Sequence, residues 1–193
     1  MEKICGYISH IPATQEPFSA DVFVVEGKKR CYIFDVGCTE GHLRAIRSIT
    51  REKIFILSHF HRDHTANIHK LEGERVYVGD LTRQKIGVGT VITEPITIAD
   101  GVRLTVRPVP SPHVGGSLIV TVNDEYALLA DLYFTRPDYD RTLGLAMMEV
   151  LEELNVRYFV VSHEEGGGVH EKSEIMPVLR AYFYKDASKA AAD

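Results

Sequence analysis

Cysteine is scarce in this sequence, and long apolar runs are absent. The 193 residues include three cysteines, Cys5, Cys31 and Cys38, which are too few and too scattered for a disulfide framework. No segment approaches the roughly 18 consecutive apolar residues of a membrane span. The first 21 residues also lack the unbroken apolar stretch of a secretory signal. We therefore expect a reduced, cytoplasmic protein with no membrane partner.

The chain also has no excess of positive charge. Its 22 lysines and arginines stand against 27 aspartates and glutamates, the formal net charge is −5, and no basic cluster stands out. Proteins that bind nucleic acid hold its phosphates with a basic patch or stripe. This composition argues against a nucleic-acid partner.

What is present is the composition of an ordinary globular protein, with 45% hydrophobic and 25% charged residues. We expect residues 1–193 to form one domain, because no linker, repeat or low-complexity stretch divides the chain. Residues 21–37 are typical of two strands joined near Gly27, and residues 53–58 of a buried strand. Each half of the chain has strands first and strand–helix units later. This order favours an α/β fold of four layers, in which two mixed sheets pack face to face with helices outside.

Three histidines and one aspartate lie within six positions of the stretch SHFHRDHTAN. His59, His61, Asp63 and His64 directly follow the apolar run KIFIL, so they belong at the end of a strand, where α/β proteins usually place their sites. Imidazole and carboxylate groups suit zinc and similar divalent ions. A solvated, histidine-rich turn is the alternative, but such a turn needs neither this spacing nor the carboxylate. The pattern therefore predicts a metal site.

Three further ligand-type residues follow other predicted strands. His113 lies between a proline turn and a glycine pair, Asp131 ends an apolar strand, and His163 precedes a glycine-rich loop. Each one alone could be a turn residue or a helix cap. Together with the first four they make seven ligand-type side chains at strand ends, which are enough for two metal ions.

These residues resemble the metallo-β-lactamase superfamily across nearly the whole chain. The motif H-x-H-x-D-H is present from His59 to His64, the three later ligands follow in the expected order, and Asp35 in YIFDVG resembles the D-x-G that ends an earlier strand of the family. The resemblance implies an αβ/βα sandwich with a dinuclear metal site at one edge. It implies that one ion is held by His59, His61 and His113, the other by Asp63, His64 and His163, and both by Asp131. Asp35 is then expected to orient a ligand or the motif loop.

The implied activity is hydrolysis through a hydroxide that bridges two divalent ions, because coordination lowers the pKa of water from 15.7 towards 7. Asp63 is the candidate catalytic residue that orients this nucleophile and handles its proton. Zinc is the first choice of metal, and iron or manganese are alternatives. The alternative function is an iron-binding redox or dioxygenase-type protein, or a metal sensor, with the same fold and no hydrolytic turnover.

Differences between this sequence and individual branches of the family limit the range of candidate substrates. The main secreted β-lactamases have a cysteine where this chain has Asp131, and hydroxyacylglutathione hydrolases have a helical domain for which about thirty residues after His163 leave no room. Flavodiiron proteins usually replace the histidine at position 61 with glutamate. What remains is a compact hydrolase of a small ester, thioester or lactone.

Other polar residues have plain structural interpretations. Thr39 and Ser173 are candidate N-caps of two helices. His42 and His69 fall in helical patterns and are expected to be exposed. Surface positions on loops are expected for the remaining candidates near the site, which are His10, Arg136, Tyr139 and His170.

Overall fold

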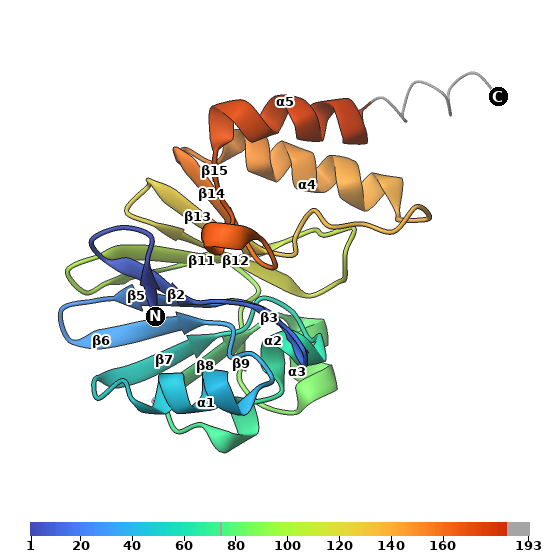
Figure 1. The fold of residues 1–193 in the computed structure, drawn as a ribbon. Coiled ribbons are helices and arrows are strands. Elements are labelled where there is room, and N and C mark those ends of the chain that lie inside the picture. The colour runs from blue at the N-terminus through green and yellow to red at the C-terminus, as the bar shows by residue number, and fades with distance from the viewer. Residues whose placement is uncertain (74, 185–193) are drawn as a thin grey trace.

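The computed structural model describes residues 1–73 and 75–184, so position 74 and the last nine positions of the predicted domain lie outside the described residues. In this part of the chain, two large sheets pack face to face (Figure 1). The first sheet has the order β1-β2-β5-β6-β7-β8-β9. Its strands are β1 (Glu2–Lys3), β2 (Ile8–Ile11), β5 (Val22–Glu26), β6 (Arg30–Phe34), β7 (Glu52–Ile56), β8 (Arg75–Val78) and β9 (Thr90–Val91). Strands β5 and β6 form the predicted hairpin, and β6 to β9 run parallel.

The second sheet has the order β10-β11-β12-β13-β14-β15. Its strands are β10 (Ile96–Ala99), β11 (Arg103–Val109), β12 (Ser117–Val122), β13 (Tyr126–Ala130), β14 (Tyr158–Val161) and β15 (Val169–Glu171). The neighbours β13 and β14 are parallel, and the other pairs are antiparallel. A separate two-stranded hairpin of β3 (Thr14–Gln15) and β4 (Phe18–Ser19) precedes β5.

Alternation along the strands explains the four layers. In the first sheet Phe34 and Ile56 point into the core between the sheets, whereas their neighbours Ile33 and Phe55 belong to a second apolar cluster under the helices. In the second sheet Leu128 faces the central core, and the residues beside it pack under the C-terminal helices. Both faces of each central strand are therefore buried, which is why these strands are apolar at nearly every position.

Five α-helices and two 3₁₀ turns are present in the described ranges: α1 (Glu40–Arg47), α2 (Arg62–Thr65), η1 (Ile68–Lys70), α3 (Asp80–Ile86), α4 (Arg141–Glu153), η2 (Glu165–Gly167) and α5 (Lys172–Phe183). Figure 1 shows α4 and α5 over the outer face of the second sheet and α1 under the first. The predicted α/β sandwich of two mixed sheets is confirmed. None of the helices described has the length and apolarity needed to cross a membrane.

One predicted helix cap is correct and one is wrong. The Thr39 hydroxyl accepts a hydrogen bond from the backbone N–H of His42 at 3.1 Å, as an N-cap of α1 does. Ser173 instead lies inside α5, which begins at Lys172. The backbone N–H of Lys172 donates to the carbonyl of Arg157, the residue before β14. The start of this helix is therefore held by a backbone carbonyl beside the sheet and not by a capping side chain.

Candidate metal centre

The predicted ligands meet at one edge of the sandwich, at the carboxyl ends of strands from both sheets. The motif from His59 to His64 follows β7 and runs into α2, and Asp35 follows the parallel neighbour β6. His113 lies between β11 and β12, while Asp131 and His163 follow the parallel strands β13 and β14. Parallel strands end at the same edge of a sheet, which explains why residues so distant in sequence come together.

Three histidines form a first group, which we call the histidine cluster: His59, His61 and His113. Nε2 of His59 lies 3.0 Å from Nδ1 of His61, and Nε2 of His113 lies 3.1 Å from the same atom. Nδ1 of His113 is 2.7 Å from the carbonyl oxygen of Phe134, which only accepts hydrogen bonds. Nδ1 of His113 therefore carries the proton, and its Nε2 turns a lone pair towards the centre of the cluster.

His59 is oriented in the same way by a relay through Ser58. The Ser58 hydroxyl donates to Asp35 at 2.7 Å, so it accepts from Nδ1 of His59, which is 2.8 Å away. The Nε2 lone pair of His59 then also faces the centre. Both Nε2 lone pairs thus point at the place where Nδ1 of His61 also lies, and three imidazole nitrogens that converge in this way can bind one divalent cation.

Two histidines and two aspartates form a second group, the mixed cluster: Asp63, His64, Asp131 and His163. Nε2 of His64 lies 3.2 Å from Oδ2 of Asp131, and Nε2 of His163 lies 3.2 Å from Oδ2 of Asp63. The opposite nitrogen of His64 is 2.7 Å from Asp35, whose other oxygen accepts from the backbone N–H of Ser58. Asp35 thus contacts the groups that orient both clusters.

Asp131 lies between the two clusters. Its Oδ2 atom is 3.2 Å from Nε2 of His64, 3.6 Å from Nε2 of His163 and 3.8 Å from Nε2 of His113. A carboxylate in this place can serve a ligand set on either side. That these seven residues bind metal ions stays a prediction, but the structure brings all seven together.

The two clusters differ in their electrostatics. Burial and the neighbouring imidazole of His64 hold the pKa of His59 well below its usual value, and burial together with His113 lowers the pKa of His61. Burial also opposes protonation of His64, yet the carboxylates of Asp35 and Asp131 raise its pKa to about 10. For His163 burial is likewise outweighed, because Asp131 and Asp63 raise the pKa to about 9. The lowered pKa values thus favour neutral imidazoles at His59 and His61, and the carboxylates of the mixed cluster attract positive charge.

Buried polar atoms test whether this site fits metal ions. Among the described residues, Oδ1 of Asp131 and both ring nitrogens of His163 are buried without a hydrogen-bond partner. Such atoms are costly in a folded protein unless something pairs with them. Imidazole and carboxylate groups together are the ligands that zinc and related divalent ions prefer, so the residues present fit two such ions.

The backbone is strained at three strand ends beside the site. Asp35, Ala130 and His163 have φ values of 63°, 50° and 65°, in the left-handed region that non-glycine residues rarely adopt. Neighbouring groups hold these conformations, since the N–H of Asp35 donates to Ile56 and that of His163 to Asp21. Strain of this kind clusters at functional sites, where it directs side chains.

Asp21 and Ser58 support the site and were missed by reasoning from the sequence. The Asp21 carboxylate is fully buried and accepts from the backbone N–H groups of Ala13 and His163, while Nδ1 of His10 lies 2.9 Å from it. It therefore fixes the loop that carries His163. Asp21 immediately precedes an apolar strand, and this was the one available signal of a buried carboxylate.

The structure corrects three expectations about other histidines. His170 lies in β15 and not on a loop, and its Nε2 is 2.7 Å from Oε2 of Glu164. His42 is not exposed but buried on the inner face of α1, where its Nε2 lies 2.9 Å from the Pro12 carbonyl and its Nδ1 2.7 Å from the Thr39 hydroxyl. His10 is not on a surface loop but buried in β2 against Asp21. The groups that pair with His42 and His10 could not be found from a helical or loop pattern, because that pattern does not show which other segments or side chains lie nearby. His69 is exposed, as predicted.

Two cavities and an aromatic ring flank the clusters. A cavity of about 530 Å³ lies beside the histidine cluster, lined by aromatic residues, by Arg136 and by Tyr139. A second cavity of about 260 Å³ lies beside His163. The ring of Phe18, on the β3–β4 hairpin, stacks on His163 with 4.5 Å between the ring centroids and is 53% exposed. Solvent and small molecules thus reach the clusters from either side.

Comparison with solved structures identifies the fold. A metallo-β-lactamase from Pontibacter korlensis matches over 92% of this chain and 97% of its own, with a TM-score of 0.70 and 16% identity. An archaeal metallo-β-lactamase superfamily protein from Sulfolobus tokodaii matches over 94% of this chain and 86% of its own, with a TM-score of 0.64 and 16% identity. A variant of a flavodiiron protein from Thermotoga maritima matches over 84% of this chain and 52% of its own, with a TM-score of 0.64 and 12% identity.

No family model and no curated protein matches the chain by sequence. At identities this low, the similarity to solved structures concerns the fold and not the activity. The resemblance predicted from the histidine motif is confirmed at that level: the chain has the metallo-β-lactamase fold.

Proposed function

We propose that this protein is a dinuclear metal-dependent hydrolase that acts on a small ester, thioester or lactone. The observation that carries the proposal is the position of Asp131 between two complete ligand clusters. In the proposed site, His59, His61 and His113 hold one ion, and Asp63, His64 and His163 hold the other. Asp131 contacts both. Zinc is the proposed occupant, with iron and manganese as alternatives.

Bound divalent ions supply an activated water at neutral pH and polarise the oxygen of the bond that is cleaved. Asp63 is the proposed proton acceptor of this reaction. Burial would raise the pKa of Asp63, but the imidazole of His163, with Nε2 at 3.2 Å, and the nearby His64 lower it. The Asp63 carboxylate is therefore ionised and can accept a proton at Oδ2. Its backbone carbonyl accepts from Ala20 and from the Ser19 hydroxyl, which fixes the residue against the β3–β4 hairpin.

The cavity beside the histidine cluster supports a substrate with an apolar acyl part. Phe60 and Phe134 line it next to His61 and His113, and its volume of about 530 Å³ is typical of a small-molecule site. The charged side chains of the lining are Arg136, Asp138 and Asp140, and Asp140 is engaged as the N-cap of α4. Arg136 is exposed and is the group of this lining that can pair with a carboxylate of the substrate. These features favour a neutral or anionic carbonyl compound as partner. The absence of nucleic-acid and membrane partners and the cytoplasmic location stay predictions.

The proposal is tested by metal analysis together with a substrate panel. Metal-loaded protein should contain about two ions per chain and should hydrolyse at least one class among aryl esters, thioesters and lactones. The panel should also include phosphodiesters and single-stranded RNA and DNA. At most one ion per chain would contradict the dinuclear site. Nuclease activity that His59→Ala abolishes, without turnover of any carbonyl substrate, would overturn the assignment of substrate.

An iron-binding redox protein is the second candidate, and the similarity to a flavodiiron protein is the observation that favours it. The intact His61 argues for the hydrolase, because that group usually has glutamate at this position. The two candidates are separated by loading the protein with zinc. A hydrolase should turn over its substrate with this redox-inactive ion, whereas the alternative predicts no turnover with zinc and an absorption spectrum that changes with the oxidation state of bound iron.

A further inference from the structure

Residues 131–140, which we call the β13–α4 loop, connect the candidate metal centre to the C-terminal helices. The loop begins with the candidate ligand Asp131. It ends at Asp140, whose carboxylate accepts from the backbone N–H groups of Thr142 and Leu143 and so caps α4. Residues 134–136 and 138–140 line the cavity of about 530 Å³ beside the histidine cluster. The conformation of this loop therefore affects both the ligands and the cavity.

The β13–α4 loop orients one of the candidate ligands through its backbone. The carbonyl oxygen that lies 2.7 Å from Nδ1 of His113 belongs to the peptide group that joins Phe134 to Thr135. A peptide group is planar and rigid, so the direction of this carbonyl depends on where the backbone of Thr135 lies. The N–H of Phe134 donates to the carbonyl of Asp131, which closes the turn that carries this peptide group. A displacement of Thr135 would turn the carbonyl away from His113.

The last helix holds Thr135 in place. Oγ1 of Thr135 lies 2.8 Å from the hydroxyl oxygen of Tyr182 on α5, so the two hydroxyls share a hydrogen bond. The ring of Tyr182 also stacks on the ring of Tyr139, with 6.0 Å between the centroids and 22° between the planes. One side chain of α5 therefore contacts the β13–α4 loop at two positions. Figure 1 shows the C-terminal end of α5 beside the start of α4, where this loop ends.

Packing against the core fixes the position of these aromatic rings. Phe183 is buried in the apolar cluster under the helices, and Tyr139 meets its ring edge-on at 5.5 Å between centroids. A Cβ atom at Gly144 of α4 would lie 2.8 Å from Tyr139 and 2.9 Å from Phe183, so only glycine leaves room for both rings. Tyr182 is 47% exposed, so it contributes less to the core than Phe183 does. Its contacts with the loop are therefore not explained by core packing alone.

From these contacts we infer that Tyr182 is a positioning residue for the candidate metal centre. It holds Thr135, and through the peptide group after Phe134 it fixes the imidazole of His113 in the histidine cluster. The inference rests on the proposed function, because it takes His113 as a ligand of one of the two ions. A tyrosine of the last described helix thus acts on a metal ligand that it does not touch, and the same contact holds the loop that presents Arg136 to the cavity.

The first test uses chelated, isotope-labelled protein and needs no metal. Tyr182→Ala should speed hydrogen exchange roughly tenfold at the N–H groups of Phe134 and Tyr139, which donate within the loop. The NMR signal of the Nδ1 proton of His113 should broaden, because its hydrogen bond to Phe134 opens to solvent. Tyr184→Ala removes a tyrosine at the end of the same helix, beside Glu152 of α4, and should change neither quantity. Unchanged exchange and an unchanged His113 signal in Tyr182→Ala would overturn the inference.

The second test measures the affinity for each zinc ion by competition with a chelator. His113 serves one of the two proposed ions, so Tyr182→Ala should weaken the binding of one ion roughly tenfold and leave that of the other nearly unchanged. A tyrosine that only stabilises the fold would affect both ions or neither, and either result would refute the positioning role. Tyr182→Phe keeps the ring and loses the hydroxyl, so its loss should be smaller, roughly two- to fivefold.

A variant on the loop side guards against misfolding of α5. Thr135→Val removes the same hydrogen bond without touching the helix, so it should match Tyr182→Phe, and the double variant should be no weaker than either. Fully additive losses would show that the two hydroxyls act separately and would contradict the inference. If the unaltered protein binds at most one ion, the proposed function fails, and the metal-free test still decides whether Tyr182 holds the loop and His113.

Discussion

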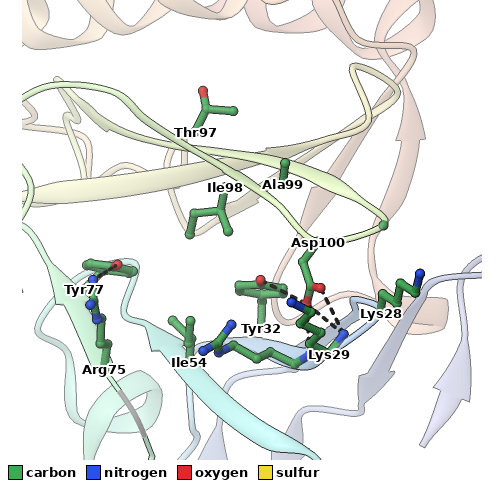
Figure 2. A pocket seen from close by; sticks show the side chains of 12 residues that line it. Lys28, Lys29, Tyr32, Ile54, Arg75, Tyr77, Thr97, Ile98, Ala99 and Asp100 are labelled. Atoms are coloured by element: carbon green, nitrogen blue, oxygen red, sulfur yellow. Dashed lines mark hydrogen bonds between the residues drawn. The ribbon is translucent and has the colours of Figure 1, made fainter.

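The two edges of this sandwich differ in whether a buried carboxylate has hydrogen-bond donors for its oxygens. At the candidate metal centre, Asp131 has an oxygen that no described group satisfies, and its other oxygen faces imidazole nitrogens at 3.2 to 3.8 Å. At the opposite edge, Asp100 is satisfied by two backbone N–H groups and a tyrosine hydroxyl (Figure 2). Asp131 thus has an oxygen without a donor from the described residues, whereas Asp100 stabilises the fold by accepting hydrogen bonds from the β5–β6 turn.

The comparison teaches that burial alone does not mark a functional carboxylate. Both aspartates follow or precede strands, and both are buried. They differ in whether the surrounding donors satisfy them, and this depends on segments distant in sequence. Strands β6 and β7 connect the two edges directly, because both begin at the edge where Asp100 lies and run to the edge of the candidate metal centre.

The largest expected effect comes from Asp131→Ala. Removal of the carboxylate that both clusters contact should lower bound metal from about two ions to one or fewer and should reduce hydrolysis by at least about a hundredfold. His69→Ala, which truncates an exposed histidine on η1, is the matched control and should change neither quantity. The measurements are elemental analysis and kcat/KM. Equal metal content in the two variants would remove Asp131 from the site.

A pair of amide substitutions sharpens the comparison between the edges. Asp35→Asn replaces the carboxylate that holds His64 and Ser58, so metal affinity should fall roughly 10- to 100-fold, as it does when the groups that orient metal ligands are lost. Asp100→Asn should lower the melting temperature but leave metal affinity unchanged. Competition with a chelator measures the affinity. If both variants lose affinity alike, the two edges do not differ in the way described.

The stability of the protein after chelation should depend on pH. The carboxylates around His64 raise its pKa in the folded state to about 10 from a usual 6.5, so the stability it contributes is fully present below pH 6.5 and is lost as the pH rises towards 10. For Asp131, burial is outweighed by His163 and His64, which lower its pKa, so its contribution is present above its usual pKa and is lost as the pH falls. The melting temperature should therefore decrease from pH 6.5 to pH 10.

Saturation with zinc should reduce this decrease, because a bound cation replaces the protons of the mixed cluster. Melting curves at several pH values, with a chelator and with zinc, provide the check. A chelated protein whose melting temperature stays constant over this range would contradict the electrostatic description of the mixed cluster.

The smallest effect is expected for Arg136→Gln. Arg136 is exposed, and an exposed ion pair contributes on the order of 0.2–1 kcal/mol, so KM for a substrate that carries a carboxylate should rise by a few-fold at most while kcat is retained. An uncharged substrate should show no change in KM. Steady-state kinetics on two substrates that differ only in the carboxylate measures this difference in KM. A loss of kcat on both would place Arg136 in the reaction itself.

The sequence was sufficient to predict that the seven candidate ligands lie together, because polar residues there interrupt or follow apolar strands. His59, Asp131 and His163 each follow a run that is buried on both faces, and a polar side chain there is conspicuous. The same reasoning could not find Asp21 or predict the burial of His42. Their partners, such as Ser162 and the carbonyl of Pro12, come from segments that only tertiary packing brings near.

The two clusters have a consequence for the order of folding. Each cluster takes ligands from both halves of the chain, since the motif follows β7 of the first sheet while His113, Asp131 and His163 follow strands of the second. Asp21, beside the first sheet, likewise holds the backbone of His163 across 142 positions. Neither half alone can assemble a complete cluster, so in the proposed site ions would bind only after the halves have docked. Metal uptake during refolding should then be slower than the formation of secondary structure. An ion bound to ligands from both halves should also lower the rate at which the halves separate during unfolding.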